Sequence, residues 1–184
     1  SSKRKAVDAL PIAPNDRIME LGSGTGNSLQ WISEKLSPQG TVVGVDISPQ
    51  MLKVSREKNA GASPAPMLVQ GDGAHLPLKA DFFDGIFCAF TLELFDSEEI
   101  SIVLNEMKRV LKPGGSFVIL SLVIEPHNFS VRVYELVHRL FPVMVDCRPI
   151  PLTDLLQQAG FSLKETHTET NFGLPVQIAA GTVM

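Results

Sequence analysis

The stretch "IMELGSGTGNSLQW", Ile18 to Trp31, places three glycines at alternate positions directly after a short apolar run. A strand that ends in a glycine-rich turn and enters a helix makes a shallow cradle, because glycine has no Cβ and tolerates positive φ. Such a cradle suits a nucleotide-like ligand, although glycines also occur in turns for structural reasons alone. The spacing is GxGxG; the dinucleotide pattern GxGxxG fails because Asn27 stands at its last position.

Strand-like and helix-like segments alternate from Arg17 onward. The pattern predicts strands at residues 17–21, 41–45, 67–70, 85–90, 116–124, 161–168 and 176–183, and helices at residues 25–36, 49–59, 98–111, 130–141 and 152–159. This order is typical of an α/β domain whose strands run mostly parallel. No helix separates the last two strands, so we expect them to pair antiparallel.

Local signals mark some boundaries of these elements. Ser48 and Ser97 are the predicted N-caps of the second and third helices. The turn "KPGG" at residues 112–115 is predicted to end the third helix, on whose apolar face we expect Ile102, Leu104 and Val110. The predicted helix at residues 130–141 follows the fifth strand as an insertion.

Composition bounds the possible functions. The chain has 184 residues, 44% of them hydrophobic, and a net charge of -4, which fits a single domain over residues 1–184. Its one dense basic run, "KRK" at residues 3–5, lies at an end that we expect to be frayed, so nucleic acid is not an expected partner. Cys88 and Cys147 lie outside any metal-binding spacing, so we expect no metal site and a reducing, cytoplasmic location. No apolar run approaches the roughly 20 residues that cross a bilayer.

Three carboxylates stand close to predicted strand ends. Glu20 directly precedes the glycine loop, Asp46 follows Gly26 by 20 residues at the end of the second strand, and Asp72 follows the third strand. Acidic residues at successive strand ends suit a ligand that is cationic or rich in hydroxyls and has no phosphate, since they repel a pyrophosphate. S-adenosylmethionine has this character.

Four motifs in order carry a resemblance to a known family. "MELGSGTGN", "VVGVDIS", "VQGDGAHLPLKADFFDGIF" and "MKRVLKPGGSFVI" resemble the motifs of the class I S-adenosylmethionine-dependent methyltransferases, from about Arg17 to Ile124. Within that family the chain is most similar to the ubiquinone/menaquinone biosynthesis C-methyltransferases and their phospholipid N-methyltransferase relatives. The resemblance implies a Rossmann-like fold with a seven-stranded, mostly parallel sheet, an antiparallel last strand and an inserted helix after strand five. S-adenosyl-L-homocysteine is the implied product of the cofactor.

The resemblance also implies roles for single residues. Glu20 would reach the amino group of the methionine moiety through water, and Asp46 would hold the ribose hydroxyls. The backbone of the loop would pass beside methionine and ribose at Gly22, Ser23, Gly24 and Gly26. Each position also has a purely structural interpretation: Asp46, for example, could be a solvated residue at the end of a strand.

The same resemblance assigns further residues to the adenine end and the methyl end of the cofactor. Ile47 and Met51 would pack on the adenine face, and Asp72 would accept a hydrogen bond from its exocyclic amine. The amides of Gly73 and Ala74 would meet the ring edge, and Phe90 and Thr91 would border the methyl group. The competing interpretation makes Ile47, Met51 and Phe90 plain core and Asp72 an ordinary turn residue.

Methyl transfer from a sulfonium needs no covalent catalyst, because an in-line displacement requires mainly positioning and exclusion of water. A carbon or oxygen acceptor must still lose a proton, and the candidate bases are Glu93, His127 and Tyr134, none of them decisive. His127 is attractive because the reference pKa of histidine is near neutrality.

The segment 125–151 departs most from the common core and is expected to cover the acceptor site. Its apolar stripe favours a small, apolar acceptor such as a quinone precursor or a lipid-like molecule, although the stripe could simply pack on the sheet. A transient contact with a membrane and the oligomeric state stay open. The alternative function is a non-catalytic S-adenosylmethionine-binding module with a regulatory or partner-binding role.

Overall fold

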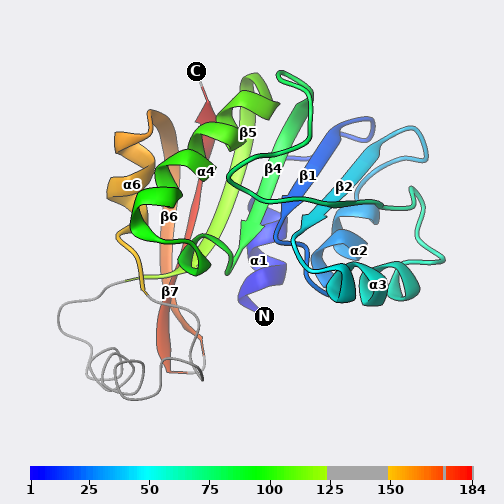
Figure 1. Cartoon of the computed structure of the whole chain (residues 1–184), viewed down its shortest axis with the longest axis horizontal. Coiled ribbons are helices and arrows are strands. Elements are labelled where there is room, and N and C mark those ends of the chain that lie inside the picture. Colours follow the sequence, from blue (N-terminus) through cyan, green and yellow to red (C-terminus); the bar gives the residue numbers. More distant parts are fainter. Residues whose placement is uncertain (124–148, 172, 184) are drawn as a thin grey trace.

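The computed structural model describes residues 1–123, 149–171 and 173–183. Its centre is a seven-stranded sheet in the order β3-β2-β1-β4-β5-β7-β6 (Figure 1). The strands are β1 Arg17–Leu21, β2 Thr41–Asp46, β3 Met67–Gln70, β4 Phe83–Ala89, β5 Leu111–Leu122, β6 Phe161–Asn171 and β7 Leu174–Val183. Neighbours from β3 to β5 pair in parallel, and β7 runs antiparallel to both β5 and β6. The predicted fold class is confirmed.

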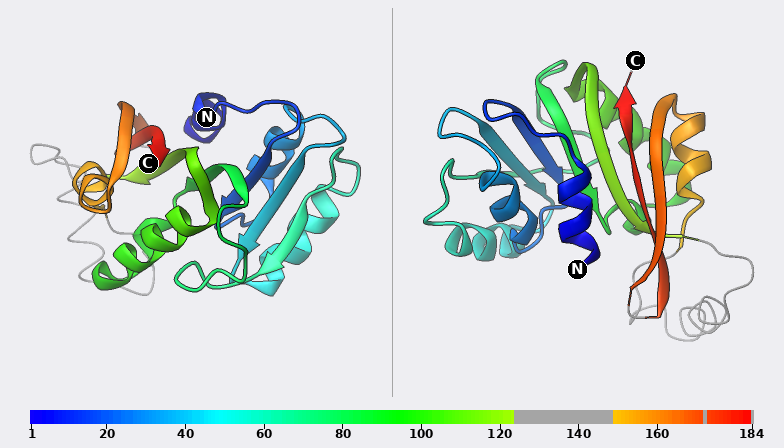
Figure 2. Two further views of the ribbon diagram at one scale, coloured as in Figure 1. Left: turned by 90° about the horizontal axis from the view of Figure 1, so that it is seen from above. Right: turned by 180° about the vertical axis from the view of Figure 1, so that it is seen from behind.

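Helices cover both faces of the sheet (Figure 1 and Figure 2). They are α1 Ser2–Ala9, α2 Asn27–Ser33, α3 Pro49–Lys58, the short 3-10 helix η1 Leu92–Leu94, α4 Ser97–Val110 and α6 Leu152–Gln158. Alternate residues of each strand point to opposite faces. Ile18 and Phe87 therefore pack in the core beneath α1 and α2, whereas Met19 and Ile86 pack in the core beneath α4 and α6.

The N-terminal segment is helical, so the expectation of a frayed end was wrong. Ala6, Val7 and Leu10 of α1 and its C-cap are buried against the sheet. The helix is also held by an ion pair, because Arg4 pairs with Glu34, the C-cap of α2, at 3.3 Å. Eight residues are too few for the periodicity of the sequence to reveal such a helix.

The N-terminus of α4 differs from the sequence-based prediction. Its N-cap is Asp96, one residue before Ser97, and Glu99 accepts a hydrogen bond from the Asp96 amide at 3.4 Å in a capping box. Leu104 and Val110 are buried as expected, but Ile102 is 45% exposed and Val103 is buried in its place.

The C-terminal end of α4 also differs. The helix ends at Val110, and the "KPGG" turn lies inside β5, where it produces a register shift between Phe83 and Gly85 of β4. The turn thus forms an irregularity in the strand and does not end the helix. Ser48, by contrast, caps α3 as predicted and accepts a hydrogen bond from the Met51 amide.

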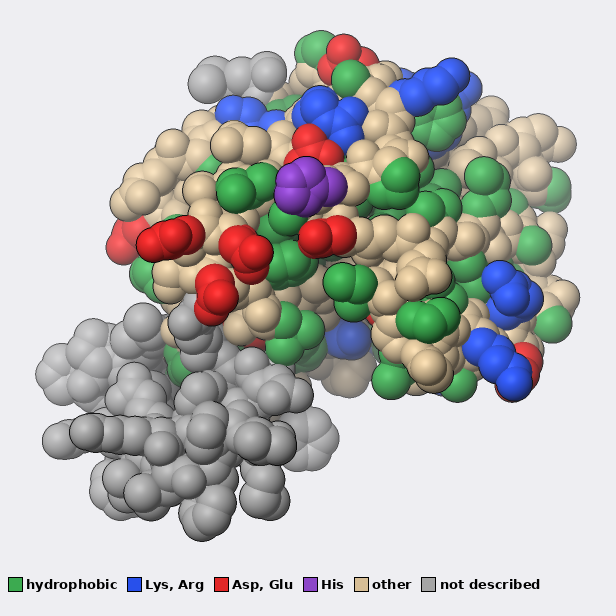
Figure 3. Space-filling model, viewed as in Figure 1, with side chains coloured by type: hydrophobic (Ala, Val, Ile, Leu, Met, Phe, Trp, Pro, Cys, Tyr) green, Lys and Arg blue, Asp and Glu red, His purple; other side chains and the backbone are tan. Residues whose placement is uncertain are grey.

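Within the described ranges, no helix combines the length and apolarity needed to cross a membrane. Acidic side chains gather over α4 on the face seen in Figure 3, and α4 carries Glu98 and Glu99 in its first turn. Such a surface repels a phosphate backbone. The predicted helix at residues 130–141 lies outside the described residues.

Candidate functional site

A pocket of about 820 Å³ lies at the carboxyl ends of β1, β2 and β4, beside η1 and the start of α4. In a parallel sheet these ends carry the ligand sites. The pocket brings together most of the residues that the resemblance assigned to the cofactor: Gly22, Gly24, Asp46, Ile47, Met51, Asp72, Gly73, Phe90 and Thr91.

The glycine loop folds back over the end of β2. The amides of Gly22 and Ser23 both donate to the Val45 carbonyl, at 2.8 and 3.0 Å. A Cβ at Gly22 would lie 2.1 Å from the Thr91 hydroxyl, which itself donates to backbone carbonyls of β1 and β4. Gly22 is therefore required where the loop meets the tip of β4.

The other two loop glycines, Gly24 and Gly26, have different surroundings. A Cβ at Gly26 would lie 2.2 Å from the Ser55 hydroxyl of α3, so this glycine is required by the packing of α2 on α3. Asn59, the C-cap of α3, also donates to the Gly26 carbonyl at 3.1 Å. At Gly24 no atom lies within 4 Å of a Cβ position, and this glycine lines the pocket. Gly24 is thus the loop glycine with open space toward the pocket.

Asp46 joins the loop to β2. Its Oδ2 accepts a hydrogen bond from the Gly24 amide at 2.7 Å, and its Oδ1 accepts one from the Ser48 amide at 2.9 Å. A carboxylate has about four acceptor positions, so each oxygen keeps capacity for a ligand hydroxyl. Asp46 is accordingly an element of local structure and a candidate ligand acceptor at once.

Glu20 is fully buried behind the loop, on the side of α1 and α2. Neither of its carboxylate oxygens makes a hydrogen bond of standard geometry among the described residues, although the Ser28 hydroxyl lies close enough to favour the charged form. Burial raises the pKa of Glu20 to about 8; Lys3 and Ser28 oppose that rise, and Asp46 adds to it. A buried carboxylate without a partner is costly, and a cationic ligand group beside it would relieve that cost.

Apolar side chains line the pocket although they are exposed. Ile47 is 69% exposed, Met51 41% and Leu94 54%. The competing interpretation of Ile47 and Met51 as plain core is therefore wrong. Clustered exposed apolar surface marks a binding site for an apolar group.

Phe90 turns the chain out of β4 with an unusual backbone. Its φ is 55°, in the left-handed region that bulky residues rarely adopt. Its amide donates to the Leu120 carbonyl at 2.8 Å, which holds the turn, and its side chain lines the pocket. Such strain is often found at functional sites.

The loop after β3 forms the far side of the pocket. Asp72 is exposed and accepts a hydrogen bond from the Ala74 amide at 2.9 Å, so that amide is already used within the loop. A Cβ at Gly73 would lie 2.9 Å from the ring of Phe95, which explains the glycine by close packing.

Several predicted site residues do not line the pocket, namely Glu20, Ser23, Gly26, Ala74 and Glu93. The Glu93 carboxylate turns to β5, where it accepts hydrogen bonds from the Ser121 hydroxyl at 3.0 Å and the Leu122 amide at 3.1 Å. Burial raises the pKa of Glu93. His127 and Tyr134 lie outside the described residues.

The sequence-based prediction missed other lining residues. They include Lys3, Leu94, Phe95 and Glu99. Leu94 and Phe95 belong to η1 and its C-cap, a single turn without a periodic signal. Lys3 could have been suspected only from the basic run at residues 3–5.

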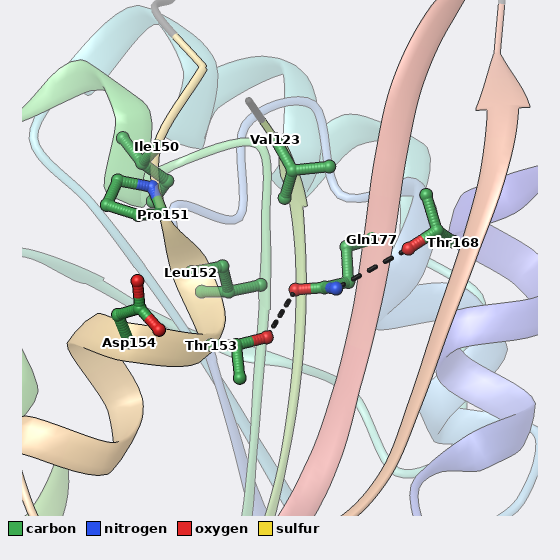
Figure 4. A pocket seen from close by; sticks show the side chains of 8 residues that line it. All are labelled: Val123, Ile150, Pro151, Leu152, Thr153, Asp154, Thr168 and Gln177. Carbon is green, nitrogen blue, oxygen red and sulfur yellow. Dashed lines mark hydrogen bonds between the residues drawn. The ribbon is translucent and has the colours of Figure 1, made fainter. Parts of the chain in front are cut away.

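A second, smaller pocket of about 220 Å³ lies beyond β5, at the start of α6 (Figure 4). Thr153 donates to the Gln177 side chain at 3.0 Å, and Gln177 donates to Thr168 at 3.4 Å. These side chains form hydrogen bonds with one another across α6, β7 and β6. We therefore interpret this pocket as a packing contact between the three elements.

Known proteins resemble this chain in sequence and fold. A family model described as "Methyltransferase domain" matches residues 18–115. The demethylmenaquinone methyltransferase of Thermus thermophilus is 31% identical over 183 residues, covering 88% of this chain and 81% of that protein. The ubiquinone/menaquinone biosynthesis C-methyltransferase of Wigglesworthia glossinidia brevipalpis is 30% identical over 125 residues, covering 67% of this chain but only 49% of that protein.

A solved structure agrees on the fold. The SAM-dependent methyltransferase of Methanosarcina mazei superposes with a TM-score of 0.76 at 20% identity, covering 94% of this chain and 95% of the other. The chain therefore belongs to the class I methyltransferases that use S-adenosylmethionine, in the branch of the ubiquinone and menaquinone C-methyltransferases.

Proposed function

We propose that this chain transfers a methyl group from S-adenosylmethionine to a small, apolar acceptor, with the ring carbon of a quinone precursor as the first choice. The observation that carries the proposal is the pocket. In it the Asp46 carboxylate, which can accept hydrogen bonds from ligand hydroxyls, stands beside exposed apolar side chains. The choice of acceptor rests on the names of the relatives, one of which is a demethylmenaquinone methyltransferase.

The residues of the pocket fit the cofactor on three observations. Asp46 has free acceptor capacity for the ribose hydroxyls. Ile47 and Met51 present apolar surface for the adenine ring. The buried, unpartnered carboxylate of Glu20 suits the ammonium of the methionine moiety.

When bound, S-adenosylmethionine supplies an electrophilic methyl group on a sulfonium. In the transfer the acceptor atom bonds to the methyl carbon, the S–CH3 bond breaks, and the sulfonium becomes a neutral thioether. The acceptor loses one proton, to a base or to water. The protein contributes orientation, and Phe90 and Thr91 would limit water near the reacting atoms from the tip of β4.

A carbon or oxygen acceptor needs a base to remove its proton. One observation about such a base favours the alternative function, a module that binds S-adenosylmethionine without catalysis. Neither a histidine nor a tyrosine of the described residues lines the pocket, and Glu93 points to β5. A module that binds S-adenosylmethionine without turnover would have the same pocket.

The test is an assay with methyl-labelled S-adenosylmethionine and a short-tailed demethylmenaquinol, followed by mass spectrometry of the lipid extract. The proposal predicts a product heavier by one methyl group and an equal amount of S-adenosylhomocysteine. Cofactor binding without methylation of this quinol, or of phenolic and lipid head-group acceptors, would favour the non-catalytic module.

A further inference from the structure

Lys3 is the one cation among the described residues that line the pocket. It lies in the first turn of α1, and its ammonium stands 5.9 Å from the centre of the Phe90 ring. Within the described part of the chain, Lys3 makes no ion pair within 4 Å. Apart from this cation–π contact with Phe90, its charge can meet a ligand.

The position of Lys3 is fixed by its neighbours on α1. Arg4 pairs with Glu34, the C-cap of α2, and its guanidinium lies 5.4 Å from the centre of the Trp31 ring. Lys5 pairs with Glu169 of β6 at 2.5 Å. The adjacent cations thus hold α1 to elements on both sides, and Lys3 alone of the three lines the pocket.

The charges around the pocket are arranged along the sheet. Asp46 is the last residue of β2, and Asp72 comes after β3. Both carboxylates therefore stand at the side of the pocket formed by these two strands. Lys3 stands at the other side, by the tip of β4, near the buried carboxylate of Glu20, whose pKa it lowers. At this side an ammonium without an ion pair and the buried carboxyl group of Glu20 therefore lie in the same neighbourhood.

We infer that Lys3 binds the carboxylate of the methionine moiety of S-adenosylmethionine, next to the ammonium that the family resemblance assigns to Glu20. The inference rests on the proposed function, because it assigns a ligand group within that pocket. The amino-acid end of the cofactor is a zwitterion. The Lys3 ammonium complements its carboxylate, and Glu20, which is buried behind the loop and protonated near pH 7 without ligand, would ionise when the ligand ammonium approaches. Ammonium-to-carboxylate hydrogen bonds are among the stronger ones in proteins.

The test compares two ligands on two variants. S-adenosylhomocysteine has the amino-acid end, whereas methylthioadenosine has the same nucleoside and thioether without it. We expect Lys3→Met to weaken S-adenosylhomocysteine binding roughly 10- to 100-fold and to leave methylthioadenosine binding unchanged, as measured by calorimetry. Lys3→Arg should restore part of the lost affinity, because it restores the charge.

The matched control is Lys164→Met, which removes an exposed cation of β6 outside the pocket and leaves the ion pairs of α1 intact. It should leave the affinity of both ligands unchanged, and thermal unfolding of each variant verifies that the fold is kept. Equal weakening of both ligands by Lys3→Met, or no weakening of either, would overturn the inference while the proposed function stands. If the unaltered protein binds neither ligand, the proposed function fails, and the inference falls with it.

Discussion

The Gly24 amide donates a 2.7 Å hydrogen bond to the Asp46 carboxylate, so the loop after β1 and the tip of β2 form one unit. Asp46 also accepts from the Ser48 amide at the start of α3. One carboxylate therefore shapes the ligand-facing loop and offers its remaining acceptor positions to a ligand. Loss of this side chain should affect binding more than folding, because the bonds lie at the surface of the pocket.

We expect Asp46→Ala to weaken S-adenosylhomocysteine binding by about 1.5–3 kcal/mol, through the loss of charge-assisted bonds to the ribose. Calorimetry measures the affinity, and a thermal melt shows that the fold is kept. Asp154→Ala, at an exposed carboxylate on α6 outside the pocket, is the control and should bind normally. A folded Asp46→Ala protein with unchanged affinity would remove Asp46 from the site.

Glu20 predicts how stability depends on pH. Its pKa is raised to about 8 in the folded protein, above the ordinary value near 4.5, so the folded state holds a proton that the unfolded state releases. Its contribution to stability is then greatest below about pH 4.5 and falls as the pH rises toward 8, by at most about 1.4 kcal/mol per pH unit. Urea titrations of the ligand-free protein across this range check the slope, and Glu20→Gln should flatten it. A slope that is the same in both proteins would contradict the assignment.

The same carboxylate predicts proton release on ligand binding. A cationic amino group beside Glu20 lowers its pKa in the complex, so binding near pH 7 should release a proton and tighten as the pH rises from about 6 to 8. Calorimetry in two buffers of different ionisation enthalpy measures the release. Identical enthalpies in both buffers would show that Glu20 keeps its charge state on binding.

The loop glycines predict different outcomes for the same substitution. Gly26→Ala meets Ser55 and a positive φ, so we expect a loss of roughly 2–4 kcal/mol in the free energy of unfolding. Gly24→Ala meets open space and should cost only about 1–2 kcal/mol of backbone strain, while it obstructs the pocket. Chemical denaturation and ligand titration of both variants separate the two roles; equal stability losses would contradict this division.

Glu93 binds β5 and does not line the pocket. We therefore expect Glu93→Ala to destabilise the protein by about 1–3 kcal/mol, because the Leu122 amide loses its buried acceptor. Glu93→Gln, which keeps an oxygen for that amide, should retain both fold and methyl transfer. A folded Glu93→Gln protein that binds cofactor and transfers no methyl group would instead support Glu93 as the base.

The sequence predicted the parts of the fold that depend on long-range patterning. The β-branched run of β2 and the glycine spacing after β1 each carry a signal over several residues, and the structure confirms the sheet that they imply. The positions of Asp46 and Gly24 follow from that sheet, because parallel strands end at one edge.

The missed features depend on contacts that no local pattern records. Helix α1 is stabilised by ion pairs to α2 and β6 and by burial of Ala6 and Val7, none of which a window of eight residues reveals. Lys3 enters the pocket only because that helix packs there. The direction of the Glu93 side chain likewise depends on the end of β5, which lies 29 residues away at Leu122.

The most direct test of the central claim is calorimetric titration of the protein with S-adenosylmethionine and S-adenosylhomocysteine, with NAD as the control. The account predicts that both sulfur compounds bind with a dissociation constant on the order of micromolar, and that NAD gives no heat, since its pyrophosphate is repelled by the carboxylates of the pocket. Binding of NAD, with no heat of binding from S-adenosylmethionine or S-adenosylhomocysteine, would contradict the account.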